Sequence, residues 1–511
     1  MANRSTEVKK RLGRIDSLSS KTIGFLGSTN FFVFLVVIFI LQASWVAISS
    51  KYSLPYDESY HVGIISAFEK TISPFAVHQD ASQSSLGDIT RYGSYLYHYA
   101  FSFIGRIVEI FSGDSNLKVE ILRFVNISVF VGAIIYIRKL LTELKFSSPV
   151  ANVAIGILVF IPTVPFLAAT INYESLFILL AALHLIVFVR LSRSMFTDIT
   201  LWTWLIASGV AGSLTKYAFL PIFASTALLS LAALLYQHKK STIVKLRTSL
   251  ARLKKGRILL LGVVVLGSIG LFSERYIYNL FAYGSPSPDC SKVLSVDSCS
   301  NWGPWERNHA LDVANKDQQP GIASAAYYAF KEWEPDMIST ATLVGGANSE
   351  RKLTLGYASK LSLGILQVFA IIGSFLFMLS IFVQKRRSGV SLVIVPIAIY
   401  VTVLFAQNYS DYLKLGAPAG VQGRYLLWAL PIIASMTMYG FGKMISGLYP
   451  RWKQSIKLAL LGIVVVAFSQ FGGLTTYFYR SEPTWFWQQD STVARINDFA
   501  KKIATKVVIG K

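Results

Sequence analysis

The chain has 511 residues, of which 53% are hydrophobic, 14% aromatic and only 15% charged. Apolar runs of about 18 or more residues recur along it, which indicates a polytopic membrane protein and excludes a soluble globule. The formal net charge of +22 comes mostly from short loops between these runs, as the positive-inside rule requires, so it indicates no nucleic-acid partner. No Gly-rich phosphate or dinucleotide motif is present, which disfavours ATP-driven and nucleotide-sugar chemistry inside the cell.

The apolar runs predict an all-α protein that crosses the membrane about eleven times, with its N-terminus in the cytoplasm. The expected units are a basic cytoplasmic N-terminus (1–30), a transmembrane module (31–275) with a first outer loop at 49–120, a large outer loop (276–360), C-terminal transmembrane helices (361–476) and an outer tail (477–511). The spans are expected at about 31–48, 121–139, 150–168, 173–190, 199–215, 218–236, 257–275, 361–384, 389–407, 425–446 and 455–476.

The segment 92–111 is apolar enough to be a twelfth span, but we expect it to lie along the membrane surface. Its polar residues recur at steps of four, four, four and three, which places them in one stripe along a helix and suits an interfacial position. Counting the segment as a span would invert every later loop and place the basic clusters outside. The residues of the stripe are Ser94, His98, Ser102, Arg106 and Glu109.

Two adjacent carboxylates, Asp57 and Glu58, follow the first span in the sequence Pro-Tyr-Asp-Glu-Ser-Tyr-His at 55–61. The helical spacing of the apolar residues at 62–68 predicts that the pair begins a juxtamembrane helix, where the helix dipole keeps both acids ionised. Neighbours on a helix point about 100° apart, so one acid would be a general base and the other a structural or metal-binding partner. His61 lies on the same side and could orient either carboxylate. The alternative is a solvated pair that only caps the helix.

Two more polar groups fall on outer turns between predicted spans. The first is Asn172-Tyr173-Glu174, where a carboxylate is costly unless it is paired or hydrated; a helix cap is the alternative. The second is Lys216, a cation on a turn predicted to lie outside, where the positive-inside rule disfavours it. It is expected to be either a phosphate ligand or a lysine that reaches the interface with its long side chain.

A third polar group, Gln422, Arg424 and Tyr425, lies at the outer edge of a later span. Two glycines, Gly420 and Gly423, would let the backbone approach a ligand closely. Arginine binds phosphate oxygens through a fork of donors. Anchoring of the span at the interface, together with the tyrosine, is the alternative.

The two cysteines, Cys290 and Cys299, both lie in the large outer loop. An oxidising exterior would allow a disulfide between them. The six histidines are scattered and there is no CxxC pair, so nothing suggests zinc. The loop also carries Trp302, Trp305 and Trp333, which could stack on sugar rings or, in the commoner case, anchor at the interface.

An outer acid and two outer cations together fit one reaction, which is transfer from a lipid phosphate to a hydroxyl. The acid deprotonates the acceptor, and the cations stabilise the phosphate that leaves with the lipid. A divalent metal is neither required nor excluded by the residues, so no cofactor is assigned.

These residues resemble the GT-C superfamily of integral-membrane glycosyltransferases, whose members carry an acidic motif in the first outer loop and use polyprenyl-phosphate-linked sugars. More narrowly, the chain resembles a bacterial family of multi-pass membrane proteins of unknown function, with an early Pro-Pro-Asp-Glu-x-x-His motif and a late Gln-Gly-Arg-Tyr motif. A tyrosine replaces the second proline here, and residues 422–425 match the late motif. The resemblance in span layout covers nearly the whole chain, whereas the motifs cover a small part of it.

The resemblance implies that Asp57 is the general base, with Glu58 its neighbour, and that transfer inverts the anomeric carbon. Glu174 would match a second outer acid of the superfamily, although Asn-Tyr-Glu is not a close copy. Some members of the superfamily need a divalent metal and others do not. The residues expected to bind substrate are His61, Glu174, Lys216, Gln422, Arg424 and Tyr425.

The expected function is transfer of a sugar from a polyprenyl-phosphate donor to an envelope glycan, glycolipid or protein, on the outer face of the cytoplasmic membrane. A transporter or flippase of lipid-linked saccharides is an alternative. It predicts charged residues buried inside spans and an inverted repeat. A third possibility is a catalytically silent assembly protein, which replacement of Asp57 by asparagine would distinguish.

Overall fold

The computed structural model describes residues 17–315 except 55, 76, 78 and 80, together with 324–342, 375, 388–448 and 492–509. Every regular element among these residues is a helix, and no strand occurs in them. In chain order they include α2 (Thr29–Ser49), α3 (Glu58–Glu69), α4 (Leu96–Phe111), α5 (Ser115–Glu143), α6 (Ser148–Phe160), α7 (Thr163–Ala169), α8 (Glu174–Arg193), α9 (Ile199–Thr215), α10 (Leu220–His238), α11 (Thr242–Ala251), α12 (Lys255–Phe272), α13 (Tyr278–Tyr283), α14 (Cys290–Val293), α15 (Val296–Ser300), α16 (Gly303–Ala314), α17 (Ala325–Tyr327), α18 (Glu334–Thr342), α21 (Ser388–Leu415), α22 (Leu430–Leu448) and α26 (Thr492–Ile509).

In the described part of the chain, six helices are long and apolar enough to cross a membrane, or seven if one bent pair counts as a span. Shorter apolar helices at Ile199–Thr215 and Leu430–Gly440 fall within two further predicted spans. The multi-pass, all-helical architecture is thereby confirmed, whereas the described residues do not confirm the expected count of about eleven. Two predicted spans, 361–384 and 455–476, lie outside the described residues apart from position 375.

The predicted span at 150–168 is not one straight helix. It is broken into α6 and α7, which are bent by 68° relative to each other. Ile161 at the break is extended, with ψ 122°, which is the conformation favoured for a residue that precedes a proline. Pro162 has no N–H and cannot continue the hydrogen bonds of α6, so a new helix begins after it.

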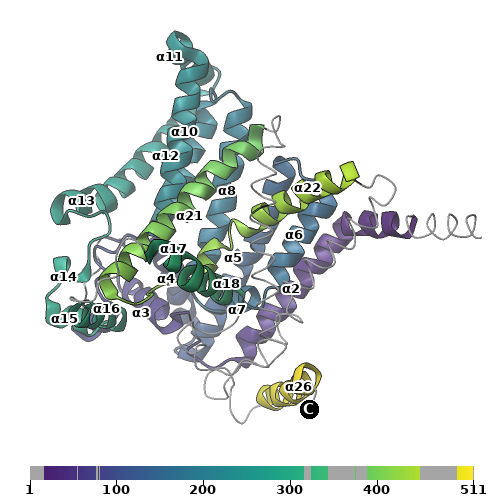
Figure 1. Ribbon diagram of the computed structural model, residues 1–511. Helices are drawn as coiled ribbons and strands as arrows, with labels where there is room; N and C mark the ends of the chain where they lie inside the picture. The colour runs from purple at the N-terminus through teal and green to yellow at the C-terminus, as the bar shows by residue number, and fades with distance from the viewer. Residues whose placement is uncertain are drawn as a thin grey trace, which may run out of the picture.

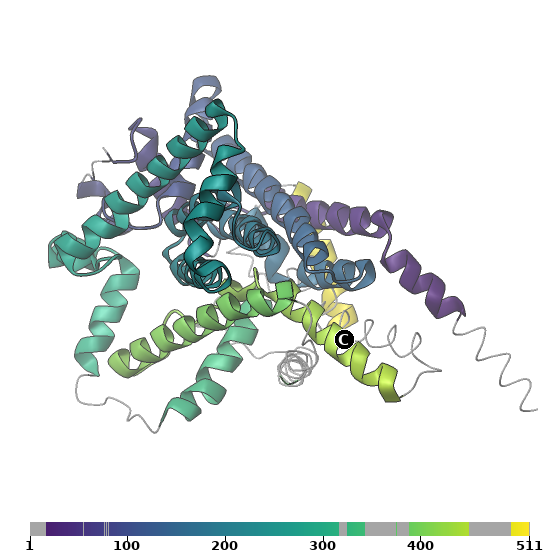
Figure 2. The same cartoon turned by 90° about the horizontal axis from the view of Figure 1, so that it is seen from above.

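The core of the bundle is built by α2, α5, α6, α7 and α8 (Figure 1). The aromatic rings of Phe39 and Phe130 are fully buried there and lie 5.2 Å apart. By contrast, Leu261 is the one buried apolar side chain of α12, and the others are exposed or half-buried, as expected for a helix that faces lipid. Seen from above, α21 and α22 follow one another along one side of the bundle, so the turn between them, which carries Arg424, lies against the bundle (Figure 2).

The predicted juxtamembrane helix is α4, which packs beside α3. Its polar stripe faces the protein rather than water, because the first three residues of the stripe are fully buried. Arg106, further along, donates to the carbonyl of Phe68 at 2.7 Å. The apolar face is the exposed one, with Ile110 and Phe111 78% and 84% exposed. The stripe therefore contributes to the contact between α4 and α3.

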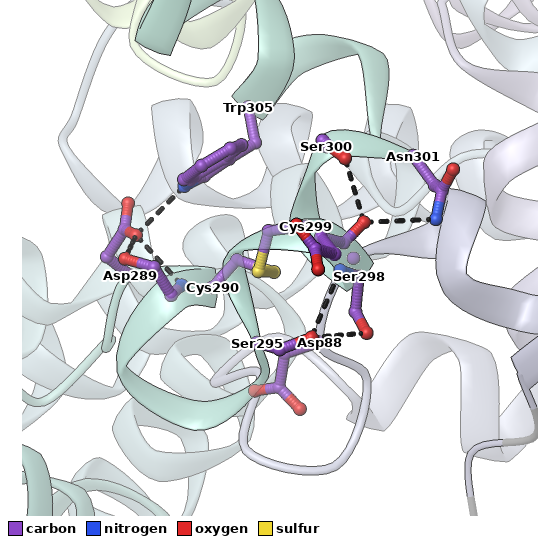
Figure 3. The surroundings of a disulfide bond; sticks show 12 residues. Asp88, Asp289, Cys290, Ser295, Ser298, Cys299, Ser300, Asn301 and Trp305 are labelled. Carbon is purple, nitrogen blue, oxygen red and sulfur yellow. Dashed lines mark hydrogen bonds between the residues drawn. A yellow bond between two sulfur atoms is a disulfide. The ribbon is translucent and has the colours of Figure 1, made fainter.

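A π-helical turn (Ser273–Ile277) continues α12 into α13, so that this helical stretch runs as far as Tyr283. The residues 284–315 then form a small lobe of short helices, which we call the disulfide lobe. A disulfide joins its Cys290 and Cys299 (Figure 3). The lobe lies at the same end of the bundle as α3 and α4, whereas α11, from the basic connection predicted to be cytoplasmic, lies at the opposite end (Figure 1).

Candidate functional site

Four charged side chains from separate segments meet near α3 and α4. Lys216 Nζ lies 2.6 Å from Glu174 Oε1. Arg424 contacts two acids: its Nε lies 3.6 Å from Glu174 Oε1, and its Nη2 lies 3.3 Å from Asp57 Oδ2. These four residues, which we call the charged cluster, were all predicted as site residues, and the structure brings them together.

Asp57 is the accessible acid of the cluster, with a side chain that is 61% exposed. It is the N-cap residue of α3 but makes no capping hydrogen bond with its side chain, so the simple capping alternative does not describe it. Tyr56 and Asp57 both have positive φ angles, 70° and 67°. That conformation costs a non-glycine residue on the order of 1 kcal/mol or more and persists only where surrounding contacts hold it. Pro55, the first residue of this motif, lies outside the described residues.

Glu58 has a different environment from its neighbour. It is completely buried, and Arg123 of α5 binds both its oxygens: Nε lies 2.8 Å from Oε1 and Nη2 lies 2.7 Å from Oε2. Glu58 also accepts hydrogen bonds from the N–H groups of Leu54 and Ile171, at 2.8 and 3.2 Å. The two acids thus point to different partners, as helix geometry required. The contacts of Glu58 are those of a residue that fixes the start of α3.

Arg123, which holds the start of α3 through Glu58, is a residue near the site that sequence reasoning missed. It is 1% exposed and also donates to the carbonyls of Ala47 and Ser50, at 3.0 and 2.8 Å. It therefore joins the C-terminal end of α2 to the beginning of α3. The available signal was an arginine near the outer end of a predicted span, which runs against the positive-inside bias just as Arg424 does.

Glu174 and Lys216 form the buried half of the cluster, 2% and 3% exposed. The side-chain oxygen of Asn172 accepts a hydrogen bond from the N–H of Glu174 at 2.9 Å and so caps the start of α8. The carboxylate of Glu174 is not needed for the cap and pairs with Lys216. Lys216 Nζ also lies 3.6 Å from the ring centroid of Tyr425, a cation–π contact. Burial lowers the pKa of Lys216 to about 8, and the carboxylate of Glu174 opposes part of that shift.

Arg424 lies in the short turn Gly423–Leu426 and is 8% exposed. Its guanidinium is stacked 4.7 Å from the ring centroid of Tyr56. Its Nε–H is buried and has no hydrogen-bond acceptor among the described residues, since Glu174 Oε1 at 3.6 Å is beyond hydrogen-bond distance. A buried donor without a partner is costly, so this nitrogen marks a position where an anionic ligand oxygen would be stabilised.

The glycine beside Arg424 serves a different purpose from the one predicted. A Cβ added to Gly423 would lie 1.8 Å from the carbonyl oxygen of Met337. The N–H of Gly423 donates to Thr340 Oγ1 at 2.6 Å. The close backbone approach is therefore to α18 of the same chain and not to a ligand. Gln422, before it, keeps a buried Oε1 that has no hydrogen-bond partner in the described part of the chain.

His61 does not orient either carboxylate, so that prediction was wrong. Its Nδ1 lies 2.8 Å from Nε2 of His98 on α4, and its ring packs edge-on against Tyr173 with centroids 4.7 Å apart. The reason is that Glu58 is occupied by its arginine partner, while the side chain of Asp57 is directed toward the charged cluster.

The loop tryptophans have distinct partners. Trp305 Nε1 donates to Asp289 within the disulfide lobe at 2.9 Å (Figure 3), and Trp333 Nε1 donates to Asn408 of α21 at 3.1 Å. Trp302 stacks on Tyr60 of α3, with ring centroids 6.2 Å apart and planes inclined by 16°. Trp302 is therefore the tryptophan that joins the disulfide lobe to the helix carrying Asp57.

Among the residues that the structure describes, no three His, Cys, Asp or Glu side chains gather so as to hold a metal ion. The two acids of the charged cluster, Asp57 and Glu174, contact the same guanidinium instead. Two carboxylates shared with an arginine do not supply the oxygen-rich shell that Mg²⁺ or Ca²⁺ prefers.

No family model and no curated protein matches the chain. Archaeal oligosaccharyltransferase AglB from Archaeoglobus fulgidus, solved with an inhibitory peptide and a dolichol-phosphate, is similar with a TM-score of 0.46 and 12% identity, over 92% of this chain and 59% of that one. The apo form of the Archaeoglobus fulgidus oligosaccharyltransferase gives a TM-score of 0.39 and 12% identity, over 93% and 60%. The chain thus spans about three fifths of the length of these structures. At such values neither similarity by itself assigns a fold or an activity.

Proposed function

We propose that the protein is an integral-membrane glycosyltransferase of the GT-C type, which transfers a sugar from a polyprenyl phosphate to a hydroxyl of an envelope glycan, glycolipid or protein. The observation that carries the proposal is the contact between an accessible carboxylate, Asp57, and a buried guanidinium, Arg424. The Nε–H of that guanidinium has no acceptor among the described residues. An acid open to a hydroxyl thus lies beside a donor prepared for a phosphate oxygen.

The reaction uses each member of the charged cluster. Asp57 takes the proton of the acceptor hydroxyl, whose oxygen attacks the anomeric carbon. A bond forms between that oxygen and the anomeric carbon, the bond from the carbon to the phosphate oxygen breaks, and its electron pair leaves with the polyprenyl phosphate. Lys216 and Arg424 stabilise the negative charge that develops on the phosphate. Glu174 favours the protonated form of Lys216, so the lysine is charged when the donor binds.

The proposed location of the reaction is the outer face of the cytoplasmic membrane. All four residues of the charged cluster come from segments that the positive-inside rule predicts to be outside. The basic connection that contains α11 lies at the far end of the bundle (Figure 1). This separation supports a site on the side opposite to the cytoplasmic loops.

The transporter alternative gains some support, because Arg123, like Arg275, is a buried charge within a candidate span. A transporter predicts such charges on a substrate path. Here, however, the guanidinium of Arg123 is bound by Glu58 and by backbone carbonyls, so its donors are already occupied. Transport of an intact lipid-linked saccharide across vesicles, without release of polyprenyl phosphate, would favour this alternative.

The experiment that tests the proposal is a transfer assay with purified full-length protein in lipid nanodiscs. A panel of polyprenyl-phosphate sugars is supplied with mixed acceptors, and release of polyprenyl phosphate is followed. We expect release by the wild type and loss of roughly 100- to 10,000-fold in Asp57→Asn, the range typical of a general base. Asp498→Asn, at an exposed acid of α26, is the matched control. No release by the wild type from any donor would contradict the proposal.

A further inference from the structure

The last described helix, α26, carries an apolar stripe that the rest of the protein does not cover. The side chains of Ile496, Phe499 and Ile503 are 46%, 67% and 50% exposed. They recur at steps of three and four residues, so they lie along one side of the helix. Contact of such a stripe with water is unfavourable, which indicates that it meets an apolar partner.

A charged stripe runs along α26 beside the apolar one. Its residues recur at steps of three, four and four, and all of them are exposed: Arg495, Asp498, Lys502 and Lys506. Three cations and one acid leave this stripe with a net charge of +2. At 100° per residue, the centres of the two stripes are roughly 90° apart. An apolar stripe flanked by lysine and arginine is typical of a helix that lies in a membrane interface.

A hydrogen bond holds α26 at the end of a candidate span. Asn497, which is fully buried, accepts from Trp45 Nε1 of α2 at 2.9 Å. Trp45 lies four residues before the last residue of α2, which is about 6 Å along the helix axis. Tryptophan is enriched where membrane spans leave the hydrocarbon. The contact therefore places α26 at the level of a membrane surface.

The orientation of α26 fits this position. The helix is seen nearly end-on in Figure 1, below α2, and along its length in Figure 2, so it runs across the ends of the spans. It lies at the same end of the bundle as α3 and the disulfide lobe (Figure 1). Ile48, one residue before the end of α2, is 43% exposed. The lipid-facing surface of α2 thus continues to the level of α26.

We propose that α26 binds the membrane surface at this end of the bundle and that its partner is anionic lipid. The apolar stripe enters the boundary between headgroups and acyl chains. The side chains of Arg495, Lys502 and Lys506 reach from beside the stripe to the headgroup phosphates, because their long apolar stems extend along it. The net positive charge favours anionic over zwitterionic headgroups. The inference is independent of the proposed function, since it involves neither the sugar donor nor the acceptor.

A second copy of the chain is a less suitable partner for the stripe. Two copies of α26 that cover each other's apolar stripes would also bring two positively charged stripes together, and like charges repel. Lipid covers the apolar side chains without this repulsion, and anionic headgroups neutralise the cations.

Spin labels on the full-length protein in nanodiscs test the depth of α26. Phosphatidylcholine and phosphatidylglycerol form the nanodiscs. The two cysteines of the chain are joined in a disulfide, so an introduced cysteine is the single free thiol. We expect labels at Phe499→Cys and Ile503→Cys to collide with oxygen, relative to a water-soluble nickel chelate, several-fold more often than a label at Asp498→Cys. Equal exposure to the nickel chelate at all three positions would overturn the proposal.

The preference for anionic lipid is tested by omitting phosphatidylglycerol. Attraction to an anionic surface favours binding by roughly 5-fold per lysine or arginine. The ratio of the immobile to the mobile component of the Phe499→Cys spectrum should therefore fall several-fold in phosphatidylcholine alone. With Lys502→Gln/Lys506→Gln added, the two lipid compositions should give nearly the same ratio.

The matched control for these charges is Lys292→Gln/Arg307→Gln, which removes two exposed cations from the disulfide lobe. It should keep the full response to phosphatidylglycerol. An equal loss of response in this control, or no response in the protein that carries Phe499→Cys alone, would overturn the assignment of anionic lipid as the partner.

Dilution of the labelled protein with unlabelled protein tests the second copy directly. Labels at Phe499→Cys would lie close together if two copies covered each other's stripes, and their spectra would be broadened by dipolar coupling. We expect the line width to be the same before and after dilution. Lines that narrow on dilution would show that a second copy, and not lipid, covers the stripe.

Discussion

Arg424 reaches Asp57 across 367 residues of chain, with Nη2 3.3 Å from Oδ2. The same guanidinium approaches Glu174, at 3.6 Å from Nε to Oε1. One planar group therefore contacts the proposed base through Nη2 and approaches the buried ion pair through Nε. Because the nitrogens of a guanidinium are fixed relative to one another, movement of Arg424 would disturb both halves of the site.

Replacement of Arg424 by lysine tests whether transfer needs the shape of the guanidinium or only its charge. Lysine keeps the charge but loses the fork of donors, so we expect kcat for transfer to fall by about 10- to 100-fold, and Arg424→Met by about 100- to 1,000-fold. Arg307→Lys, at an exposed arginine of α16, is the control. Equal activity of Arg424→Lys and the wild type would show that only charge matters at this position.

The pH dependence of transfer should follow Lys216. Its pKa is lowered by burial from 10.5 to about 8, so the ammonium is present below pH 8 and is lost above it. Donor affinity should therefore fall as the pH rises through 8. The unfolded chain, in which lysine titrates near its ordinary value, binds more protons than the folded chain between pH 8 and 10.5. The contribution of Lys216 to folding stability thus rises with pH in that window.

As the pH rises, donor affinity should fall while the contribution of Lys216 to folding stability rises. A loss of binding that is caused by the lost cation can therefore be told apart from one that is caused by unfolding. Equilibrium binding of a polyprenyl-phosphate sugar and thermal unfolding would be measured from pH 6 to 10 on the same samples. Lys216→Arg keeps its charge throughout, so its binding curve should stay flat where the wild-type curve declines. A decline of the same size in Lys216→Arg would assign the pH dependence to another group.

The pair Glu58–Arg123 should control folding more than chemistry. Breaking a buried ion pair by removing one partner costs about 3–5 kcal/mol, so Glu58→Gln and Arg123→Met should each lower the unfolding temperature markedly. Arg123→Met should be the worse of the two, because it also leaves the carbonyls of Ala47 and Ser50 without their donor. The double variant Glu58→Leu/Arg123→Met should recover part of the loss. Thermal unfolding in detergent checks this, and full stability of Glu58→Gln would contradict it.

Sequence reasoning located the charged cluster because outer acids and outer cations are rare and stand out against the charge bias. It did not find the partners of those residues. Apolar periodicity indicates which segments are helices, but not which faces meet, and Glu58 meets Arg123 from 65 residues away. The same limit applies to α4, whose polar stripe was recognised although its partner, α3, was not.

The packing of the turn Gly423–Leu426 against α18 should fix the position of Arg424. Gly423→Ala would place a Cβ 1.8 Å from the carbonyl oxygen of Met337, a contact that only a backbone shift can relieve. That shift would move Arg424 away from Asp57, so we expect a loss of transfer larger than the loss of stability. Gly303→Ala is the control, because no heavy atom lies within 4 Å of a Cβ added there. Unchanged transfer by Gly423→Ala would show that the turn is free to move.

The disulfide lobe should be held as a unit by Cys290–Cys299. A cross-link that closes a loop of about ten residues stabilises by about 2–3 kcal/mol in the chain-entropy description. Reduction, or Cys290→Ser/Cys299→Ser, should therefore raise hydrogen exchange across the lobe and around Tyr60, on which Trp302 stacks. Exchange in the core helices α5 and α8 should be unaffected and serves as the internal control. Unchanged exchange around Tyr60 after reduction would show that the lobe does not stabilise this part of α3.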